Sequence, residues 1–340
     1  MKPISHSHNR LVTLIILVIT GLGVVVVASD WQDMKQVLVQ ADWHFLPLVL
    51  LFTFFSYACY SYGYAYVCDL LGIQMGKREL AEVCFISTVV NHVLTTGGVA
   101  GYSVRYLLLK MYRVTFKDLI ASSFLHYYLT SLDMLTFLPL SFIYLLMNAA
   151  VPRGIAIALG LMTLLFGFML ILTTIFVVFP SSRYPIIQLI GRLGVKILHR
   201  DYFNWLTELD ETITRATRAI RQRPLLLGWI MLLTLVDFVC SIAAMGVVFE
   251  ALGPPISAPS LVTGYVIGIM AGLLSMVPGG IGVQEGSMAG IYALLGVKFE
   301  QAVLAAILFR ILYYLVPYFL IWPFYNRLSR KANQQPAILP

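Results

Sequence analysis

Long apolar runs without a single charge constrain this chain more than any other feature. Residues 11–29 and 154–179 contain no Asp, Glu, Lys or Arg, and both approach or exceed the ~20 residues that an α-helix needs to cross a bilayer. Only 11% of the 340 residues are charged, whereas an ordinary soluble domain carries about a quarter. The sequence therefore predicts an all-α polytopic membrane protein.

Six segments are long and apolar enough to cross the membrane: 11–29, 46–70, 117–147, 154–179, 225–249 and 299–325. We interpret the first as a retained span, because it is longer than a usual signal-peptide core and no A-x-A site precedes Asp30. Two further apolar stretches, 80–112 and 260–297, are each interrupted by a glycine pair. The second piece of each has about 14 residues, or ~20 Å of helix, which is short of the ~30 Å hydrocarbon core.

The basic residues predict how these segments are oriented. Lys2 and Arg10 precede the first span, and the loop that follows it is acidic. If 80–112 and 260–297 dip into the membrane and return, every basic cluster lies on the cytoplasmic side, as the positive-inside rule requires. The sequence then predicts about six transmembrane helices, two re-entrant helical hairpins, and cytoplasmic termini at 1–10 and 326–340.

The two halves of the chain share one order of elements: span, span, broken hairpin, span. Residues 11–147 form the first repeat and residues 154–325 the second, and Gly97-Gly98 aligns with Gly279-Gly280. Three crossings in each half is an odd number, so the second copy is inverted. Inverted repeats with broken helices near the midplane are typical of transporters.

The second repeat also includes a polar, basic segment at 181–223. Within it, apolar residues recur at steps of three and four, as on one face of an amphipathic helix: Tyr202, Leu206, Leu209, Ile213, Ala216 and Ile220. This cytoplasmic helix either lies on anionic lipid headgroups or packs on the protein.

Glu285 is a carboxylate inside an apolar stretch. It follows a glycine-rich break, Pro278 to Gly282, and so falls in the first turn of the next helix, where the helix dipole favours an anion. An ionised group at mid-membrane otherwise costs roughly 2.5–3.5 kcal/mol. Two interpretations remain open: a structural pairing, for example with Arg310, or a direct part in transport.

Arg105 is the corresponding charge in the first hairpin. Its fixed positive charge and fork of donors fit a phosphate group, and hairpins entering from opposite faces would bring it toward the same central region as Glu285. The other substrate-binding candidates are Arg310, Gly97, Gly98, Gly279, Gly280, Gly282, Gln284 and Asn91. The intramembrane candidates for a proton relay, each of which could instead be a satisfied structural group, are His92, His126, Asp133 and Asp237.

Several classes of function are disfavoured. The net charge of +7 follows from the positive-inside distribution and does not indicate nucleic-acid binding. The four cysteines have no metal-like spacing, and neither a nucleotide-binding glycine motif nor a G-x-S-x-G motif is present. The longest polar segment, of roughly 40 residues, is too short for a separate catalytic domain. We expect no metal and no cofactor, and a transporter rather than an enzyme, with transferase activity as an open alternative.

Two motifs resemble the lysylphosphatidylglycerol synthase transmembrane family over about residues 10–327. They are Asn-x-x-x-x-x-Gly-Gly-x-x-Gly-x-x-x-Arg, from Asn91 to Arg105, and Pro-Gly-Gly-x-Gly-x-x-Glu, from Pro278 to Glu285. Gln284 departs from this pattern, because many relatives carry a basic residue there. The resemblance implies a bacterial inner-membrane protein that moves a lipid between leaflets through a central site formed by re-entrant helices.

The leading hypothesis is therefore a flippase for an anionic phospholipid or polyprenyl lipid. The alternatives are a membrane-embedded transferase acting on lipid-linked substrates and a scaffold for a partner lipid-synthesis enzyme. Membrane lipids are the expected partners, and a homo-oligomer is compatible with the sequence.

Overall fold

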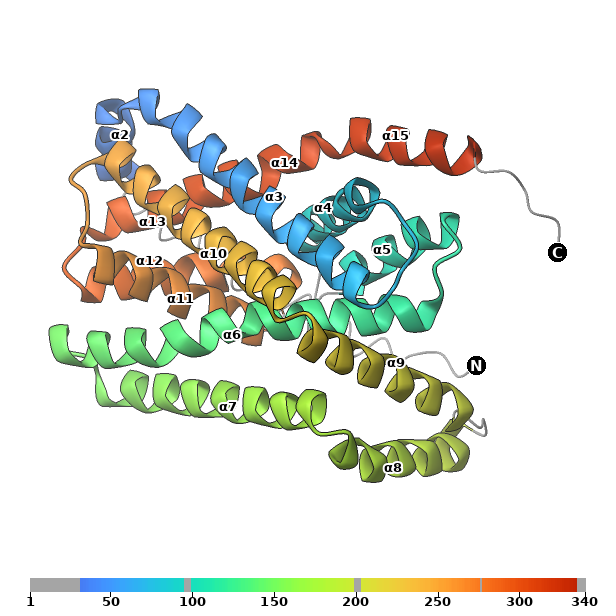
Figure 1. Cartoon of the computed structure of the whole chain (residues 1–340). Coiled ribbons are helices and arrows are strands. Elements are labelled where there is room, and N and C mark those ends of the chain that lie inside the picture. The colour runs from blue at the N-terminus through green and yellow to red at the C-terminus, as the bar shows by residue number, and fades with distance from the viewer. Residues whose placement is uncertain (1–30, 95–98, 199–202, 276, 335–340) are drawn as a thin grey trace.

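A computed structural model describes residues 31–94, 99–198, 203–275 and 277–334. The predicted N-terminus 1–10, the span 11–29 and Gly97-Gly98 lie outside these residues. Throughout the described part, every regular element is helical (Figure 1). The elements are α2 (Trp31–Gln40), η1 (Trp43–Phe45), α3 (Leu46–Leu70), α4 (Lys77–Leu94), α5 (Val99–Met111), α6 (Phe116–Asn148), α7 (Arg153–Val178), α8 (Pro180–Leu198), α9 (Phe203–Gln222), α10 (Pro224–Leu252), α11 (Ala258–Leu274), η2 (Pro278–Gly280), α12 (Val283–Leu294), α13 (Phe299–Arg310), η3 (Ile311–Leu315), α14 (Val316–Phe319) and α15 (Ile321–Gln334).

Five helical segments are long and apolar enough to cross a membrane: Trp43–Leu70, Phe116–Asn148, Arg153–Val178, Pro224–Leu252 and Phe299–Ala332. Each coincides with a span predicted from the sequence. The prediction of an all-α polytopic membrane protein is confirmed.

The last of these spans is not one uninterrupted α-helix. The turn η3 is π-helical, and the amide of Val316 donates to the carbonyl of Ile311, five residues earlier. Pro317 explains the break, because proline has no N–H and its ring would clash with the carbonyl of Tyr313, four residues before it. The chain then continues through α14, a turn at Leu320 and α15 to Gln334, beyond the predicted limit at residue 325.

The predicted hairpins correspond to two pairs of short helices. Helices α4 and α5 pack against each other, as do α11 and α12, and Figure 1 shows the two pairs toward opposite ends of the molecule. The turn η2 of the second pair contacts α4 of the first. The two broken segments therefore contact each other, through α4 of the first and η2 of the second.

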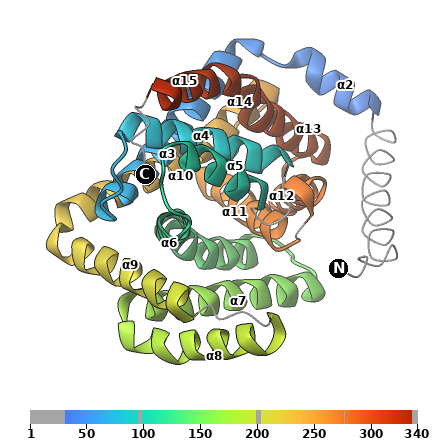
Figure 2. The same cartoon turned by 90° about the vertical axis from the view of Figure 1, so that its right-hand side faces the viewer.

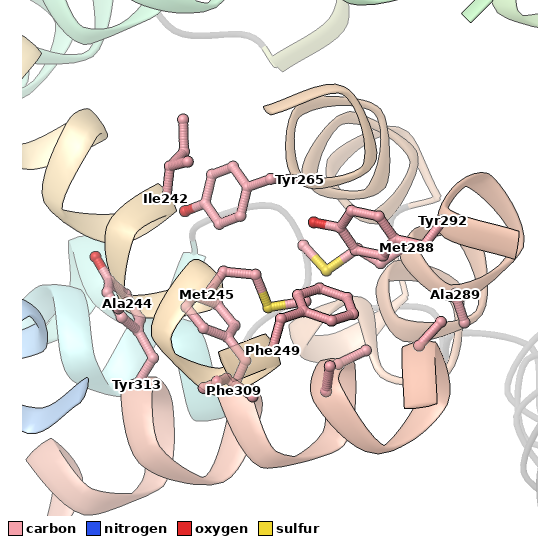
Figure 3. Packing of buried hydrophobic residues seen from close by; sticks show 14 of the residues in the cluster. Ile242, Ala244, Met245, Phe249, Tyr265, Met288, Ala289, Tyr292, Phe309 and Tyr313 are labelled. Carbon is pink, nitrogen blue, oxygen red and sulfur yellow. The ribbon is translucent and has the colours of Figure 1, made fainter. Parts of the chain in front are cut away.

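Glycines allow the close approach of α11 and α12. A Cβ atom at Gly264 would lie 2.2 Å from the ring of Tyr292, and one at Gly268 would lie 2.1 Å from Cγ of Met288. Small residues at such positions let helix backbones approach in membranes. Figure 3 shows Met288 and Tyr292 packed with side chains of α10, including Phe249, whose ring centroid is 4.8 Å from that of Tyr292.

Helices α7, α8 and α9 lie together at one side of the molecule (Figure 2). Helix α9 buries Leu206, Ile213 and Ala216 of the predicted stripe, so this half of segment 181–223 packs on the protein. Helix α8 instead exposes apolar side chains, among them Tyr184 and Leu189. The described part of the stripe therefore packs on the protein, and contact of this segment with lipid headgroups stays a prediction.

Ion pairs fasten α15 to α4. Glu79 pairs with Lys331 and lies 3.8 Å from Arg327, while Glu82 accepts from Arg327 Nη1 at 2.6 Å. The hydrogen bond from Lys331 lowers the pKa of Glu79, whereas burial raises the pKa of Glu82. Charge pairing thus holds the C-terminal helix against the start of the first short pair.

Candidate functional site

A cavity of about 320 Å³ lies where the two broken segments meet. Its polar wall includes Tyr57, Asn91, His92, Asp237 and Gln284, contributed by α3, α4, α10 and α12. Apolar side chains of α6, α7 and α11 also line it, including Met134, Phe166, Ile269 and Leu273, and α6 adds the polar residues Thr130 and Ser131. The cavity lining is therefore amphipathic.

The glycine turn before α12 brings the second motif to this cavity. Gly279, Gly280 and Gly282 have φ of 62°, 64° and 81°, a left-handed conformation that glycine adopts without steric cost. Gly279 and Gly280 line the cavity. A Cβ atom at Gly279 would lie 3.1 Å from the carbonyl oxygen of His92, so the turn sits directly against the end of α4.

Glu285 is held at the start of α12 and pairs with Arg310. Its Oε2 accepts from the amide of Gly282 at 2.7 Å, and its Oε1 accepts from Arg310 Nε. Arg310 Nη2 also donates to the carbonyl of Gly279 at 3.0 Å. The Arg310 side chain is 17% exposed and the Glu285 side chain is 14% exposed. Of the partners left open by the sequence, Arg310 is thus the one that Glu285 contacts.

Gln284 connects this pair to the cavity wall. Its Nε2 donates to the hydroxyl of Tyr314 at 2.9 Å. The Tyr314 ring lies 4.7 Å from the ring of His92 and 5.2 Å from the guanidinium of Arg310. An uncharged amide therefore faces the cavity at the position where the resemblance led us to expect a base.

Arg105 lies apart from Glu285, in a buried site of its own. Its Nε and Nη1 donate to the hydroxyls of Ser87 and Ser123, each at 3.0 Å. Its Nη2 donates to Cys84 Sγ at 3.4 Å, and its guanidinium stacks 4.3 Å from the centroid of Tyr64. The side chain is 4% exposed, and none of its partners among the described residues is a carboxylate.

A small pocket of about 10 Å³ separates Arg105 from the main cavity. Thr88, Asn91 and Tyr127 line both spaces. These three side chains therefore form the boundary between the large cavity and the uncompensated positive charge of Arg105.

The four proton-relay candidates fall into two groups. His92 and Asp237 line the cavity, whereas His126 and Asp133 are buried and do not. The ring of His126 packs 4.5 Å from that of Tyr60 and 5.5 Å from that of Tyr64. The structure thus brings only two of the four to the candidate site.

Sequence reasoning missed the tyrosines and serine that connect these groups. Tyr57, Tyr313 and Tyr314 line the cavity, and Ser56 hydrogen-bonds to both Asp237 and Tyr313. A signal was present in α3, because Tyr57, Tyr60 and Tyr64 share one helical face at spacings of three and four. From the sequence alone, however, this face could not be distinguished from an ordinary aromatic core.

The apolar spans define a multi-pass membrane protein. The chain belongs to the family described as lysylphosphatidylglycerol synthase TM region, whose model matches residues 11–321. It is similar to a UPF0104 membrane protein of Pyrococcus horikoshii, with 22% identity over 322 residues, or 89% of this chain and 93% of the relative. A UPF0104 membrane protein of Methanothermobacter thermautotrophicus is 20% identical over 307 residues, or 88% and 90% of the two chains. The family resemblance is confirmed.

Proposed function

We propose that this protein moves a phospholipid or another anionic lipid between the two leaflets by passing its headgroup through the cavity. The observation that carries the proposal is the amphipathic cavity at the meeting point of the two broken segments. A polar headgroup crosses hydrocarbon at a high cost in free energy, and a polar wall inside the protein lowers that cost. The volume of about 320 Å³ is at the lower end of ordinary ligand sites, roughly 300–1,000 Å³.

The apolar wall supports a route for the acyl chains. Leu273 lines the cavity and is 56% exposed, so the wall continues onto the surface that would face lipid. Phe166 of α7 also lines the cavity. A lipid could then keep its chains in the bilayer while its headgroup occupies the cavity.

The positive charge of Arg105 supports the proposal that the transported lipid has an anionic headgroup. It is a fixed positive charge without a carboxylate partner among the described residues, and its guanidinium geometry suits phosphate oxygens. In the structure Thr88, Asn91 and Tyr127 stand between it and the cavity. Direct contact between Arg105 and a phosphate therefore requires these side chains to move. Before they move, the positive charge of Arg105 attracts the anionic headgroup electrostatically without touching it.

The arrangement of the short helices supports alternating access. In this proposal α4–α5 and α11–α12 are re-entrant hairpins of an inverted repeat, entering from opposite faces with their tips at the cavity. Backbone breaks are tolerated at membrane depth only where protein or a water-filled cavity covers them, and η2 at the cavity wall meets this condition. In this proposal the basic residues of α9 and α15 lie on the cytoplasmic side of a bacterial inner membrane, as the positive-inside rule favours.

Reconstituted liposomes test this function. Vesicles containing fluorescent phosphatidylglycerol are treated with dithionite, which bleaches only outer-leaflet lipid, and wild-type protein is expected to increase the bleachable fraction. Thr130→Trp, which fills the cavity, should slow this movement. A matched control is Thr163→Trp on α7, because both threonines bond back to the carbonyl four residues earlier but Thr163 lies outside the cavity. Wild-type vesicles that behave like protein-free vesicles for every anionic or polyprenyl lipid would refute the proposal.

A further inference from the structure

Asp237 is a carboxyl group near the middle of the 29-residue helix α10. It lines the cavity, so water or solutes that enter can reach it. Among the described residues it forms no ion pair, and the hydrogen bond to it comes from the hydroxyl of Ser56. An acid inside a membrane segment is expensive unless it has a functional or structural partner.

Among the described residues, no basic side chain forms an ion pair with Asp237. The titratable side chains close enough to interact with it electrostatically come from α3, α4, α6, α10, α11 and η3, and they are acids, thiols and phenols. They are Tyr57, Cys59, Tyr60, Cys84, Asp133, Cys240, Tyr265 and Tyr313. Asp133 is the other carboxyl group of this set and is a like charge. A proton taken up from the cavity would neutralise Asp237.

Ser56 and Tyr313 form a directed hydrogen-bond chain that ends at this carboxylate. Ser56 donates its single hydroxyl hydrogen to Asp237 Oδ1, and its oxygen also contacts the hydroxyl of Tyr313. Because a serine hydroxyl has only one hydrogen, Tyr313 must be the donor in the second bond. Both hydrogens therefore point toward Asp237, which is the arrangement that an ionised carboxylate stabilises.

Tyr313 is also bound through its backbone. Its carbonyl, released from the helix because Pro317 has no N–H, accepts from the hydroxyl of Tyr57 at 3.2 Å. Tyr57 in turn contacts His92 Nδ1 at 2.8 Å, at the end of α4. Tyr313 lies three residues after Arg310, which donates to the carbonyl of Gly279 in the glycine turn between α11 and α12. Tyr313 is thus linked to Asp237 through Ser56, to α4 through Tyr57 and His92, and to the glycine turn through the neighbouring Arg310.

We infer that Asp237 binds and releases a proton from the cavity, and that Tyr313 transmits this change of charge to the π-helical turn beside Arg310. Protonation removes the anion that orients the Ser56 and Tyr313 hydroxyls, and the Tyr313 side chain is then free to adopt another position. The inference rests on the proposed function, since it makes lipid movement dependent on a proton gradient.

The first experiment compares lipid movement with and without a pH gradient across the liposome membrane. A gradient of one pH unit changes the protonation ratio of an accessible site by about tenfold, and the wild-type rate is expected to rise several-fold. The quantity compared is the ratio of the two rates within each variant. Asp237→Asn and Tyr313→Phe should bring this ratio to unity, while Glu250→Gln, which alters an exposed acid of the same helix α10 outside the cavity, should preserve the wild-type ratio. A wild-type ratio of unity, or an unchanged ratio in Asp237→Asn, overturns the inference.

A second measurement detects proton binding independently of lipid transport. Infrared difference spectra of the protein in nanodiscs are recorded as the pH is raised, and a carboxylic-acid band should disappear. Asp237→Asn should lack this band, whereas Tyr313→Phe should retain it, because the proton site remains while its coupling is lost. Thermal unfolding and gel filtration establish that each variant is folded. If wild-type protein moves no lipid, the proposed function fails, and the infrared band alone decides whether Asp237 binds a proton: its persistence in Asp237→Asn refutes the site.

Discussion

Arg310 at the end of α13 forms an ion pair with Glu285 in the first turn of α12, and the same guanidinium holds the carbonyl of Gly279. Three backbone features therefore converge on one side chain: a helix start, a glycine turn and the π-helical turn that follows Arg310.

Breaking this pair should destabilise the protein strongly. Removing one partner of a largely buried pair leaves the other charge unpaired and costs about 3–5 kcal/mol. We expect Arg310→Met and Glu285→Gln each to lower the thermal unfolding temperature in detergent. The double variant should lose less than the sum of the two, because neither charge is then left alone. Arg218→Met, at an exposed position of α9, should change little. Additive losses would contradict the pairing.

The glycine contact between α11 and α12 should not tolerate a methyl group. Gly268→Ala places Cβ 2.1 Å from Met288 Cγ, so the two helices must separate or Met288 must move. We expect a reduced yield of folded protein and a lower unfolding temperature. Gly167→Ala in α7 is the matched control: nothing lies within 4 Å of its added Cβ, and alanine favours a helix by roughly 1 kcal/mol over glycine. Equal behaviour of the two variants would refute the close packing.

Arg105 should matter for anionic lipids more than for others. Loss of a hydrogen bond to a charged group costs about 1.5–3 kcal/mol, so Arg105→Gln is expected to slow phosphatidylglycerol movement by about tenfold or more. Movement of a neutral glycolipid analogue without a phosphate, in the same vesicles, reports any general damage to the fold. Arg105→Lys keeps the charge and loses the planar fork, and should fall between wild type and Arg105→Gln. If the protein only supports a partner synthase, all three forms will sustain the pathway equally.

The link between α15 and α4 should weaken in acid. The pKa of Glu79 is lowered from its ordinary value of 4.5 by its hydrogen bond from Lys331. A carboxylate with a lowered folded-state pKa stabilises the protein above 4.5 and loses this effect as the pH falls through the lowered value. Lys331→Met should therefore reduce the unfolding temperature at neutral pH, and the difference from wild type should disappear in strong acid. Glu82, whose pKa is raised, is present in both proteins and cancels in the comparison. A difference that does not vary with pH would exclude this linkage.

The apolar runs were sufficient to predict the five described spans and the two broken segments, because hydrocarbon thickness fixes helix length directly. The partner of Glu285 was not predictable, since Arg105 and Arg310 are equally charged and only the packing of α13 against α12 distinguishes them. Arg105 is satisfied by Ser87, Ser123 and Cys84, and small polar residues of this kind give no sequence pattern. The break in the last span had a signal in Pro317, but proline in a membrane helix predicts a disturbance without specifying a π-helical turn.

The π-helical turn sets the rotational phase of everything after it. A π turn accommodates one additional residue within a helix, and one residue corresponds to about 100° of rotation at 3.6 residues per turn. Arg327 and Lys331 therefore face the glutamates of α4 because of an offset introduced at residues 311–315. Deleting a single residue there would turn the charged face of α15 away from α4, so the length of this turn, and not its chemistry, aligns α15 with α4.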